Sequence, residues 1–295
     1  MRILLAGASG FLGSRLIPHL RGGGHEVTQL VRRAPDRADQ VRWDPSAGQL
    51  DVAVLERVDA VVNLAGVGVS AKRWTPEFKR ALRDSRIVTT RALAEAMART
   101  PRGPRVLLNS SAVGYYGDTG DREVDEQAPP GEGFLADLCR DWEAATKPAA
   151  EAGVRVALLR TGFPLSGAGG LLKPLLLQYR LGAGGPMAGG RQYQPWISLP
   201  DWLDAVGFVL AREDVGGPVN LTGPRPVTNA ELGKALGARL HRPSLVPVPA
   251  FALRLVLGEF GGEAVRSQRV VPKVLLAHGF PFAQPTVSEA LAVAV

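Results

Sequence analysis

The chain has 295 residues, and its 35 lysines and arginines against 28 aspartates and glutamates give a formal net charge of +7. The basic residues are spread along the sequence without clusters or interleaved aromatic residues, which argues against a nucleic-acid-binding protein. Cys139 is the only cysteine and the four histidines are isolated, so the sequence excludes an intrachain disulfide and predicts no metal site.

No apolar run reaches the ~20 residues of a membrane span, and the sequence starts directly with a predicted strand. We therefore expect a cytoplasmic protein with no membrane segment or signal peptide. The length allows one large domain or two unequal ones.

The first thirteen residues predict a strand, a tight turn and the start of a helix. An apolar run over residues 1–6 is followed by Gly7, Gly10 and Gly13. This spacing suits a turn with positive φ, the close approach of a pyrophosphate, and a helix packed tightly on the strand. The alternative is a plain turn, because 35 glycines make chance spacings common. Residues 14–20 continue with helical periodicity, so we predict a dinucleotide site at the amino end of this helix.

The second predicted strand, residues 25–31, ends at Val31 and is followed by Arg32 and Arg33. Sites that prefer NAD place a carboxylate here for the ribose 2′-hydroxyl, whereas a 2′-phosphate requires arginine. The sequence therefore predicts NADP, with Arg32 the first candidate and Arg33 the second. The alternative is a solvated arginine pair.

Two further strands are predicted at residues 41–45 and 58–66. Asp44 ends the first, either to accept from the adenine amino group or to open a turn before proline. The second ends in Leu64, Ala65 and Gly66, whose small size lets a flat cofactor lie against the backbone. The alternative is a simple end of the strand at Gly66.

A long helix is predicted over residues 74–97, with Thr75 as its cap and Pro76 at its first position. Arg86 lies in the middle of this helix. On the side facing the sheet it would reach the pyrophosphate or ribose of a cofactor. On the other side it would be an ordinary surface arginine, and the sequence alone leaves both open.

Hydroxyl groups gather after the fifth predicted strand, residues 105–111. Ser111, Tyr115 and Tyr116 follow at its carboxyl end, where side chains face the nicotinamide crevice of such folds. There they can orient a carbonyl or hydroxyl substrate and donate a proton.

The alternation of strands and helices continues to a sixth strand at residues 153–162 and predicts an α/β fold with a Rossmann-type, doubly wound parallel sheet. We expect an NADP-binding domain over residues 1–165 and a smaller substrate lobe over 166–295, with a return segment near 200–225 packing on the first domain. The glycine-rich loop 181–190 is either a substrate lid or a solvent loop. Trp196 and Trp202 are either core anchors or a stacking site.

Together these segments resemble the extended short-chain dehydrogenase/reductase superfamily, and within it the atypical branch of epimerase/dehydratase-like "epimerase family" proteins. The resemblance covers nearly the whole chain. Its motifs are Gly7–Gly13, Trp43-Asp44, Val62–Gly66, Ser85-Arg86, Tyr115–Gly117, Leu159–Gly162, Trp196-Ile197 with Asp201, Thr228–Glu231, and Ser267–Val270 followed by Pro272.

The resemblance implies a Rossmann domain that carries NADP and a carboxyl-terminal lobe that contacts the substrate. It implies pyrophosphate contacts from the glycine loop, a 2′-phosphate contact from Arg32, and closure near the nicotinamide by residues 161–165. Pattern and resemblance together predict these cofactor-binding residues: Gly7, Ser9, Gly10, Phe11, Leu12, Val31, Arg32, Arg33, Asp44, Leu64, Ala65, Gly66, Arg86, Ser110, Thr161, Gly162, Phe163 and Leu165.

The chain departs from the family at the catalytic pair. Extended dehydrogenases carry Tyr-x-x-x-Lys at the start of the helix before strand six, whereas Phe134 and Leu138 stand here. Neither side chain transfers a proton. Ser111 matches the serine that assists this tyrosine, although a one-residue shift of the alignment puts Ala112 there.

Two hypotheses follow. The first is an NADP-dependent oxidoreductase or epimerase-like enzyme whose proton relay is rebuilt from Ser111, Tyr115 or Tyr116 and whose small-molecule substrate is unidentified. The second is a non-catalytic NADP-binding regulatory or scaffold protein. In either case we expect a monomer or homodimer with no nucleic-acid or membrane partner.

Overall fold

A computed structural model describes residues 1–295 and is organised around one seven-stranded sheet. All its strands run parallel, in the order β11-β7-β5-β4-β1-β2-β3. The strands are β1 (Arg2–Ala6), β2 (Glu26–Val31), β3 (Gln40–Arg42), β4 (Ala60–Asn63), β5 (Val106–Ala112), β7 (Arg155–Thr161) and β11 (Gly217–Leu221). The predicted α/β fold with a doubly wound parallel sheet is confirmed.

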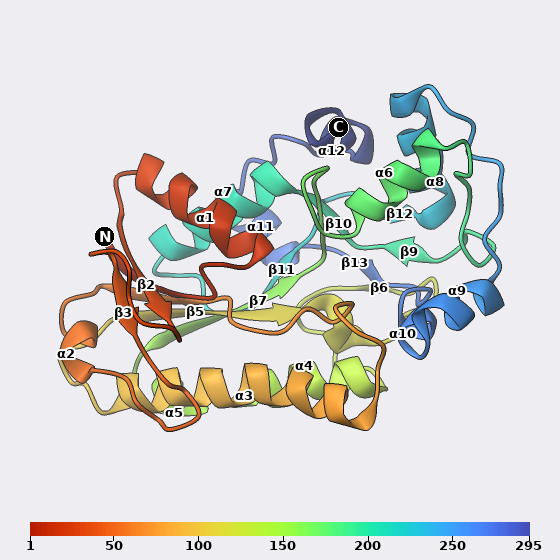
Figure 1. Ribbon diagram of the computed structural model, residues 1–295. Coiled ribbons are helices and arrows are strands. Elements are labelled where there is room, and N and C mark those ends of the chain that lie inside the picture. The colour runs from red at the N-terminus through yellow and green to blue at the C-terminus, as the bar shows by residue number, and fades with distance from the viewer.

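Helices cover both faces of the sheet (Figure 1). One face carries α3 (Pro76–Ala98), α4 (Phe134–Ala144) and α5 (Lys147–Glu151). The other carries α1 (Phe11–Gly22) and α7 (Leu199–Ala211). Short helices α2 (Val52–Leu55) and α11 (Lys273–Ala277) lie at the periphery.

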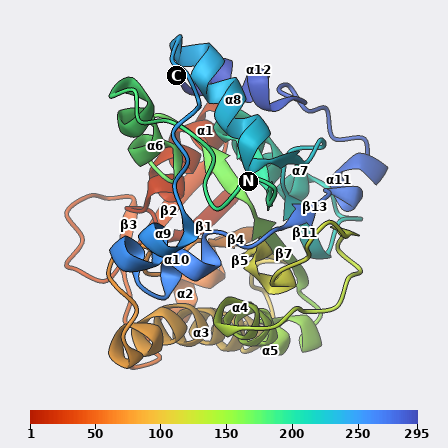
Figure 2. The ribbon, with the colours of Figure 1, turned by 90° about the vertical axis from the view of Figure 1, so that its right-hand side faces the viewer.

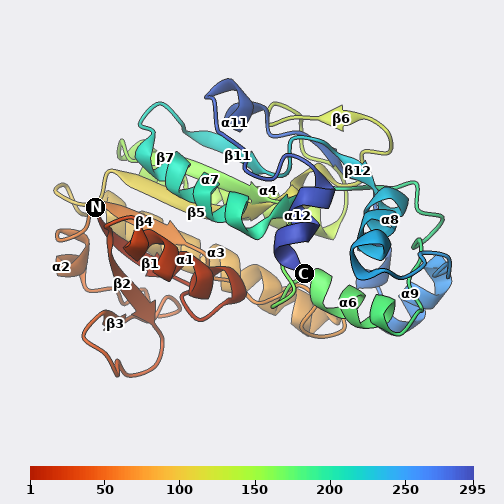
Figure 3. The ribbon, with the colours of Figure 1, turned by 90° about the horizontal axis from the view of Figure 1, so that it is seen from above.

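A smaller lobe lies beside the carboxyl ends of the strands (Figures 2 and 3). Its helices are α6 (Leu172–Arg180), α8 (Asn229–Leu240), α9 (Ala250–Leu257), α10 (Phe260–Glu263) and α12 (Val287–Ala294). Three two-stranded pairs complete the fold: β8 (Phe163–Leu165) with β10 (Trp196–Ser198), β9 (Tyr193–Gln194) with β12 (Val227–Thr228), and β6 (Glu123–Val124) with β13 (Arg269–Val270). A single 3₁₀ turn, η1 (Val113–Tyr116), follows β5.

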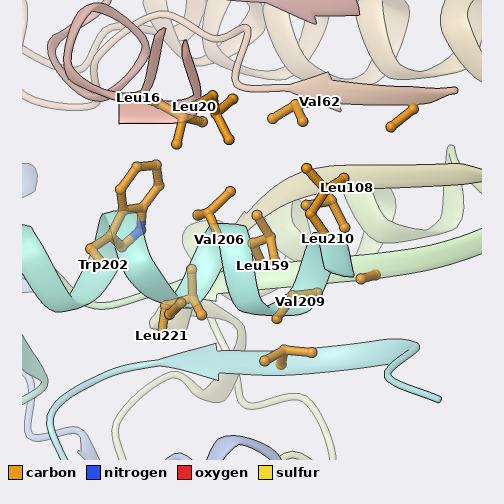
Figure 4. Packing of buried hydrophobic residues seen from close by; sticks show 14 of the residues in the cluster. Leu16, Leu20, Val62, Leu108, Leu159, Trp202, Val206, Val209, Leu210 and Leu221 are labelled. Atoms are coloured by element: carbon orange, nitrogen blue, oxygen red, sulfur yellow. The ribbon is translucent and has the colours of Figure 1, made fainter. Parts of the chain in front are cut away.

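The largest hydrophobic core lies between the sheet and the layer of α1 and α7. Figure 4 shows side chains of both helices meeting those of the strands: Leu16, Leu20, Trp202, Val206, Val209 and Leu210 against Val62, Leu108, Leu159 and Leu221. Alternate residues of the strands face the opposite layer, as the pleat requires: Ile3 and Leu5 belong to this core, whereas Leu4 packs toward α3.

Both tryptophans singled out in the sequence are core anchors. Trp196 and Trp202 have exposed fractions of 1% and 0%. Each indole N–H finds an oxygen: Trp202 Nε1 donates to Thr161 Oγ1 at 3.2 Å, and Trp196 Nε1 donates to the Arg225 carbonyl at 3.1 Å. The alternative of a stacking site is wrong for both residues.

The chain leaves the sheet for the small lobe after β7 and then returns. Helix α7 packs on α1, and β11 pairs with β7 from Gly217 to Leu221 as the last strand of the sheet. Residues 200–225 thus belong to the sheet and its covering layer, although they follow the first part of the small lobe in sequence. The domain boundary at residue 165 stays a prediction.

The glycine-rich loop 181–190 is tied along its length to the segment after α8. Val246 N donates to the Gly184 carbonyl, and Val248 N donates to the Pro186 carbonyl, both at 2.9 Å. A Cβ on Gly185 would lie 2.0 Å from the Val246 carbonyl oxygen, so the two segments are in direct contact. The loop is therefore a packed part of the small lobe, which fits neither a free lid nor a solvent loop.

Two general properties bear on the choice of function. None of the helices combines the length and apolar character needed to span a bilayer. No group of three or more His, Cys, Asp or Glu side chains is arranged to hold a metal ion.

Two glycines fix how the first helix sits on the first strand. Gly7 has φ +86°, and a Cβ there would lie 2.5 Å from the Leu64 carbonyl carbon. A Cβ on Gly13 would lie 2.3 Å from the Gly7 carbonyl oxygen. Only glycine allows the turn and the helix to approach this closely.

We predict that Gly13→Ala lowers the free energy of unfolding by about 1–3 kcal/mol, because the new methyl group meets the backbone of Gly7 and Ala8. Gly22→Ala is the matched control in the same helix, since a Cβ there meets nothing within 4 Å. It should be neutral or slightly stabilising. Urea denaturation followed by circular dichroism measures both variants. Equal denaturation midpoints would show that the helix can shift without cost.

Candidate functional site

A cleft of about 540 Å³ opens at the carboxyl ends of β1, β2 and β4. Strand order reverses between β1 and β4, and ligands of open α/β sheets bind at such a point. Nine of the predicted cofactor residues line it: Gly7, Ser9, Gly10, Val31, Arg32, Arg33, Leu64, Ala65 and Gly66. The structure thus brings together segments from three separate parts of the sequence.

The amino end of α1 faces this cleft without any side-chain cap. Gly10 is the capping residue and makes no side-chain hydrogen bond, and the first turn holds no acidic residue. The first backbone N–H groups of a helix are unpaired within it and carry a partial positive charge. This end is therefore suited to a phosphate group.

The side chains of Phe11 and Leu12 pack outside the cleft, unlike the glycine loop that precedes them. The Phe11 ring lies against the loop of Gly169, where a Cβ would come within 2.5 Å of the ring, and Leu12 packs on the hydrophobic core. Neither is among the residues that line the cleft. Their backbone N–H groups at the helix start remain the part that can meet a phosphate.

Arginine side chains gather at the far end of the cleft. Arg33 pairs with Asp36 at 2.6 Å, and Arg37 pairs with Asp39 at 2.6 Å. Arg32 is exposed, lines the cleft and has no carboxylate partner. Of the two arginines that the sequence singled out, Arg32 is thus the one left free for an anion.

Arg86 is buried against Gly66 of the cleft without a counter-ion, and it is not itself among the residues that line the cleft. Its exposed fraction is 9%, and its only hydrogen bond goes from Nη1 to the Leu82 carbonyl of its own helix, at 3.1 Å. The guanidinium lies 5.0 Å from the Trp142 ring centroid, and a Cβ on Gly66 would lie 3.3 Å from Cζ. Burial lowers the pKa of Arg86. Of the two interpretations left open by the sequence, the surface arginine is wrong.

Asp44 stabilises a turn and does not lie in the cleft. Its Oδ1 accepts from the backbone N–H groups of Ser46 and Ala47, at 2.9 and 3.2 Å. It is exposed and does not line the cleft, whereas its neighbour Trp43 does. The adenine contact of Asp44 stays a prediction that this geometry does not favour.

Several residues that line the cleft were not predicted from the sequence: Ala8, Gln29, Leu30, Arg37, Gln40, Trp43, Val67, Ser85 and Thr89. Two carried a readable signal. Arg37 is a third arginine soon after Arg32, and Ser85 precedes Arg86 in a quoted motif. Ser85 Oγ accepts from the Val67 N–H at 3.1 Å and so fixes the loop that follows β4.

The residues predicted to lie at the nicotinamide end are not among those that line the cleft. Ser110, Thr161 and Phe163 are half-buried at the ends of β5, β7 and β8. Leu165 is 2% exposed and packs in the core of the small lobe, so its side chain is not available to a cofactor. Gly162 presses on the Pro195 carbonyl, which a Cβ would approach to 2.0 Å.

A buried ion pair holds two of the three hydroxyls proposed for catalysis. Arg160 binds Glu143 through Nε and Nη2, at 2.8 Å each. Ser111 Oγ donates to Glu143 Oε1 at 2.6 Å. Tyr116 is 2% exposed; its hydroxyl donates to Asn220 Oδ1 at 2.7 Å and accepts from Arg160 Nη1 at 2.9 Å.

This network argues against the hypothesis that Ser111 or Tyr116 carries the proton relay. Both hydroxyls are committed to partners inside the protein, and burial raises the pKa of Tyr116 to about 12. Tyr115 is different: it is half-buried, with the Arg160 guanidinium 3.5 Å from its ring centroid. It stays the candidate among the three.

The position of the usual catalytic tyrosine is filled by an aromatic cluster. Trp74 meets Phe134 edge-on at 5.0 Å between centroids, and Phe260 of α10 lies 5.6 Å from Trp74. Lys79 Nζ sits 5.1 Å from the Phe134 ring centroid and pairs with Glu259 at 2.5 Å. Leu138 is buried in the same cluster. Val67 also packs there, so the cluster adjoins the cleft.

A second cleft of about 640 Å³ lies on the small-lobe side of this cluster. Its lining is mostly charged: Asp118, Arg254, Gly258, Glu259, Gly262, Glu263, Val265 and Arg266. Only Asp118 comes from the first half of the chain. None of these residues was identified from the sequence.

Comparisons with known proteins agree with this geometry. A model described as "NAD dependent epimerase/dehydratase family" matches residues 3–222, and one described as a domain of unknown function (DUF1731) matches residues 248–294. "Epimerase family protein Mb2239" of Mycobacterium bovis is 47% identical over 290 residues, which cover 98% of this chain and 96% of that protein.

Two solved structures are similar over the whole chain. The human epimerase family protein SDR39U1 (isoform 2), crystallised with NADPH, has a TM-score of 0.91 at 32% identity and covers 100% of this chain and 99% of that one. A nucleoside-diphosphate sugar epimerase from Corynebacterium glutamicum has a TM-score of 0.83 at 34% identity, covering 100% of this chain and 58% of that one.

We predict that Arg86→Met separates stability from cofactor binding. Methionine keeps the packing on Trp142 and removes a buried charge that has no partner, so the thermal midpoint of the cofactor-free protein should stay equal or rise. The dissociation constant for NADPH should rise about 10- to 100-fold, the worth of a hydrogen bond to a charged group.

The matched control is Arg83→Met, one turn earlier in α3, where the arginine pairs with Asp141 on α4. It should leave NADPH affinity unchanged. Fluorescence titration and thermal melts measure the two quantities. Unchanged affinity in Arg86→Met would remove Arg86 from the cofactor site.

Proposed function

The chain belongs to the NAD dependent epimerase/dehydratase family, and from this premise we propose that it is an NADP(H)-dependent oxidoreductase or epimerase-like enzyme acting on a small carbonyl or hydroxyl compound. The observation that carries the proposal is the pair Arg32 and Arg86. One is an unpaired arginine in the lining of the cleft, and the other is a buried arginine whose guanidinium lies against Gly66 of that lining. The NADPH bound to the human relative supports the choice of cofactor.

Different residues in and around the cleft bind different parts of the cofactor. The uncapped start of α1, with Gly7, Ser9 and Gly10, receives the pyrophosphate. Arg86, buried next to Gly66, neutralises part of the negative charge of the pyrophosphate. Arg32 binds the 2′-phosphate, where guanidinium and phosphate match in geometry and charge.

When bound, NADPH would supply a hydride at the nicotinamide end, and NADP⁺ would accept one there. The chain's own residues shape the space around that end. The cluster of Trp74, Phe134 and Phe260 keeps water away from one side. The charged cleft beyond it offers groups that hold a polar substrate and exchange protons with solvent.

A non-catalytic role is the second candidate, and one observation favours it: Phe134 and Leu138 replace the family's acid/base pair with apolar groups. It predicts tight NADPH binding without turnover and a protein partner whose affinity changes with the cofactor. The enzyme is preferred because a charged cleft on the other side of the aromatic cluster from the proposed cofactor site is more than cofactor binding requires.

The test is consumption of NADPH, followed by its absorbance, with a panel of aldehydes, ketones and nucleoside-diphosphate sugars at several pH values. The sugars are included because the Corynebacterium relative is described as an epimerase of such compounds. We expect turnover with at least one class. Tight NADPH binding with no turnover across the panel would favour the non-catalytic role.

We predict that Arg32→Glu reverses the cofactor preference. A carboxylate repels the 2′-phosphate but accepts from a free 2′-hydroxyl. The dissociation constant for NADPH should therefore rise about 10- to 100-fold while that for NADH stays equal or falls. Arg102→Glu, in the turn before β5 and so at the amino ends of the strands, away from the cleft, is the control with the same change of charge. Titration with both cofactors decides it; parallel loss of NADPH and NADH affinity would contradict the assignment.

A further inference from the structure

The proposed enzyme lacks a proton donor at the family's usual position, and the small lobe brings a carboxyl group to that place. We propose that Glu263 of α10 is the proton-transfer residue of this site, in place of the missing tyrosine. The inference rests on the proposed function and adds to it a residue from the lobe that the sequence left unassigned.

Contacts on two sides place the segment of Glu263 beside Phe134, which stands at the family's tyrosine position. Phe260, one helical turn earlier in α10, lies against Trp74, which in turn meets Phe134. On the other side, Arg266 binds Glu263 at 3.0 Å and donates from Nη1 to the Glu132 carbonyl at 2.7 Å. A Cβ on Gly133 would lie 2.7 Å from Arg266 Nη2. The residues before and at the start of α4 are thus held against the segment that carries Glu263.

The side chain of Glu263 is enclosed but still reaches a cleft open to solvent. Its exposed fraction is 11%, compared with 52% for its neighbour Glu259, and both line the charged cleft. This combination suits a proton-transfer group, which must be shielded where it meets substrate and still recover its proton from water.

The groups around Glu263 shift the pKa of its carboxyl group in opposite directions. Burial raises the pKa of its carboxyl group above the ordinary 4.5; Arg266 and Lys79 lower it, and Glu259 and Asp118 raise it. Arg254 is the remaining charged group of the cleft. The net direction is upward, so more of the carboxyl group keeps its proton toward neutral pH than at an ordinary glutamate.

The step balances without any further reactant. In the direction of reduction, a hydride passes from NADPH to the carbonyl carbon, and the Glu263 carboxyl group gives its proton to the carbonyl oxygen. The products are an alcohol, NADP⁺ and a Glu263 carboxylate. The carboxylate then takes up a proton from water in the charged cleft. Oxidation of the alcohol runs through the same groups in reverse.

Two other candidates are weaker. Glu126 is also buried and its pKa is raised by burial, but its Oε1 accepts from the Asn220 and Val274 N–H groups at 3.0 and 3.3 Å, inside the network of Arg160. Tyr115 is half-buried at the end of η1, with one face of its ring covered by Arg160. It is therefore included in the test as the rival.

The experiment compares the full-length NADPH-bound protein with Glu263→Gln, Glu263→Asp and Tyr115→Phe. Glu151→Gln, in an exposed pair with Lys147, is the control. The panel compound with the fastest turnover is the probe, and kcat and kcat/KM are measured from pH 5 to 9. Carboxyl ¹³C NMR, with Glu263→Gln as the assignment reference, follows the titration of Glu263 independently of turnover.

We expect Glu263 to titrate above 4.5 and kcat/KM for reduction to fall as pH rises through that same value. Glu263→Gln should lose about 10²- to 10⁴-fold in kcat, lose this pH dependence and keep NADPH affinity within twofold. Glu263→Asp should keep the pH dependence at reduced kcat, which preserves the test if the glutamine variant does not fold.

Two results overturn the assignment alone: a Glu263 that titrates at or below its ordinary value, or turnover in Glu263→Gln with the native pH profile. Loss of turnover in Tyr115→Phe with native behaviour in Glu263→Gln moves the role to Tyr115. Absence of turnover in the native protein with every compound refutes the proposed function, and the assignment fails with it.

Discussion

The buried pair of Arg160 and Glu143 is the interaction on which the arrangement of the site depends. It joins the end of β7 to α4, and it draws in Ser111 from β5 and, through Tyr116, Asn220 from β11. A charged pair this far from water is costly unless its remaining hydrogen-bonding groups are satisfied, and the hydroxyls of Ser111 and Tyr116 satisfy them. Groups that would otherwise face the crevice are thereby committed to structure. Of the three crevice hydroxyls, only that of Tyr115 lies outside this network, and the proposed role of Glu263 adds a group from the small lobe.

The parallel sheet and the glycine turn after its first strand were predictable because both depend on local patterns. Apolar runs that end in small residues give parallel strands, and the glycine spacing marks a turn with positive φ at Gly7 and the close contact of Gly13 with that turn. The resemblance to the epimerase branch was likewise predictable and is confirmed. Only the structure could decide between a buried and a surface position for Arg86, because the helical pattern does not show whether an arginine in the middle of a helix faces the sheet or the solvent.

The charged cleft was not predictable for a different reason. Asp118 and the segment 254–266 are more than a hundred residues apart, and they meet only because the small lobe folds back over the start of α4. The hydrogen-bond partners of Ser111 and Tyr116 were not predictable for the same reason. Whether a hydroxyl at the end of a strand faces a substrate or a buried charge is decided by Glu143, 32 residues beyond Ser111.

The return of the chain to complete the sheet has a consequence for how the protein is made. Strand β11 pairs with β7 only after residue 221 has been synthesised, when α6 and the first part of the small lobe already exist. Until then, the edge of β7 has unpaired backbone groups, which invite pairing with another chain. The nascent protein thus passes through an aggregation-prone stage about 60 residues long, and a chain cut anywhere within the small lobe before β11 would remain in it. The small lobe is made of two chain segments, one before α7 and one after β11, so a single cut cannot remove it and transferring it between relatives would require three junctions.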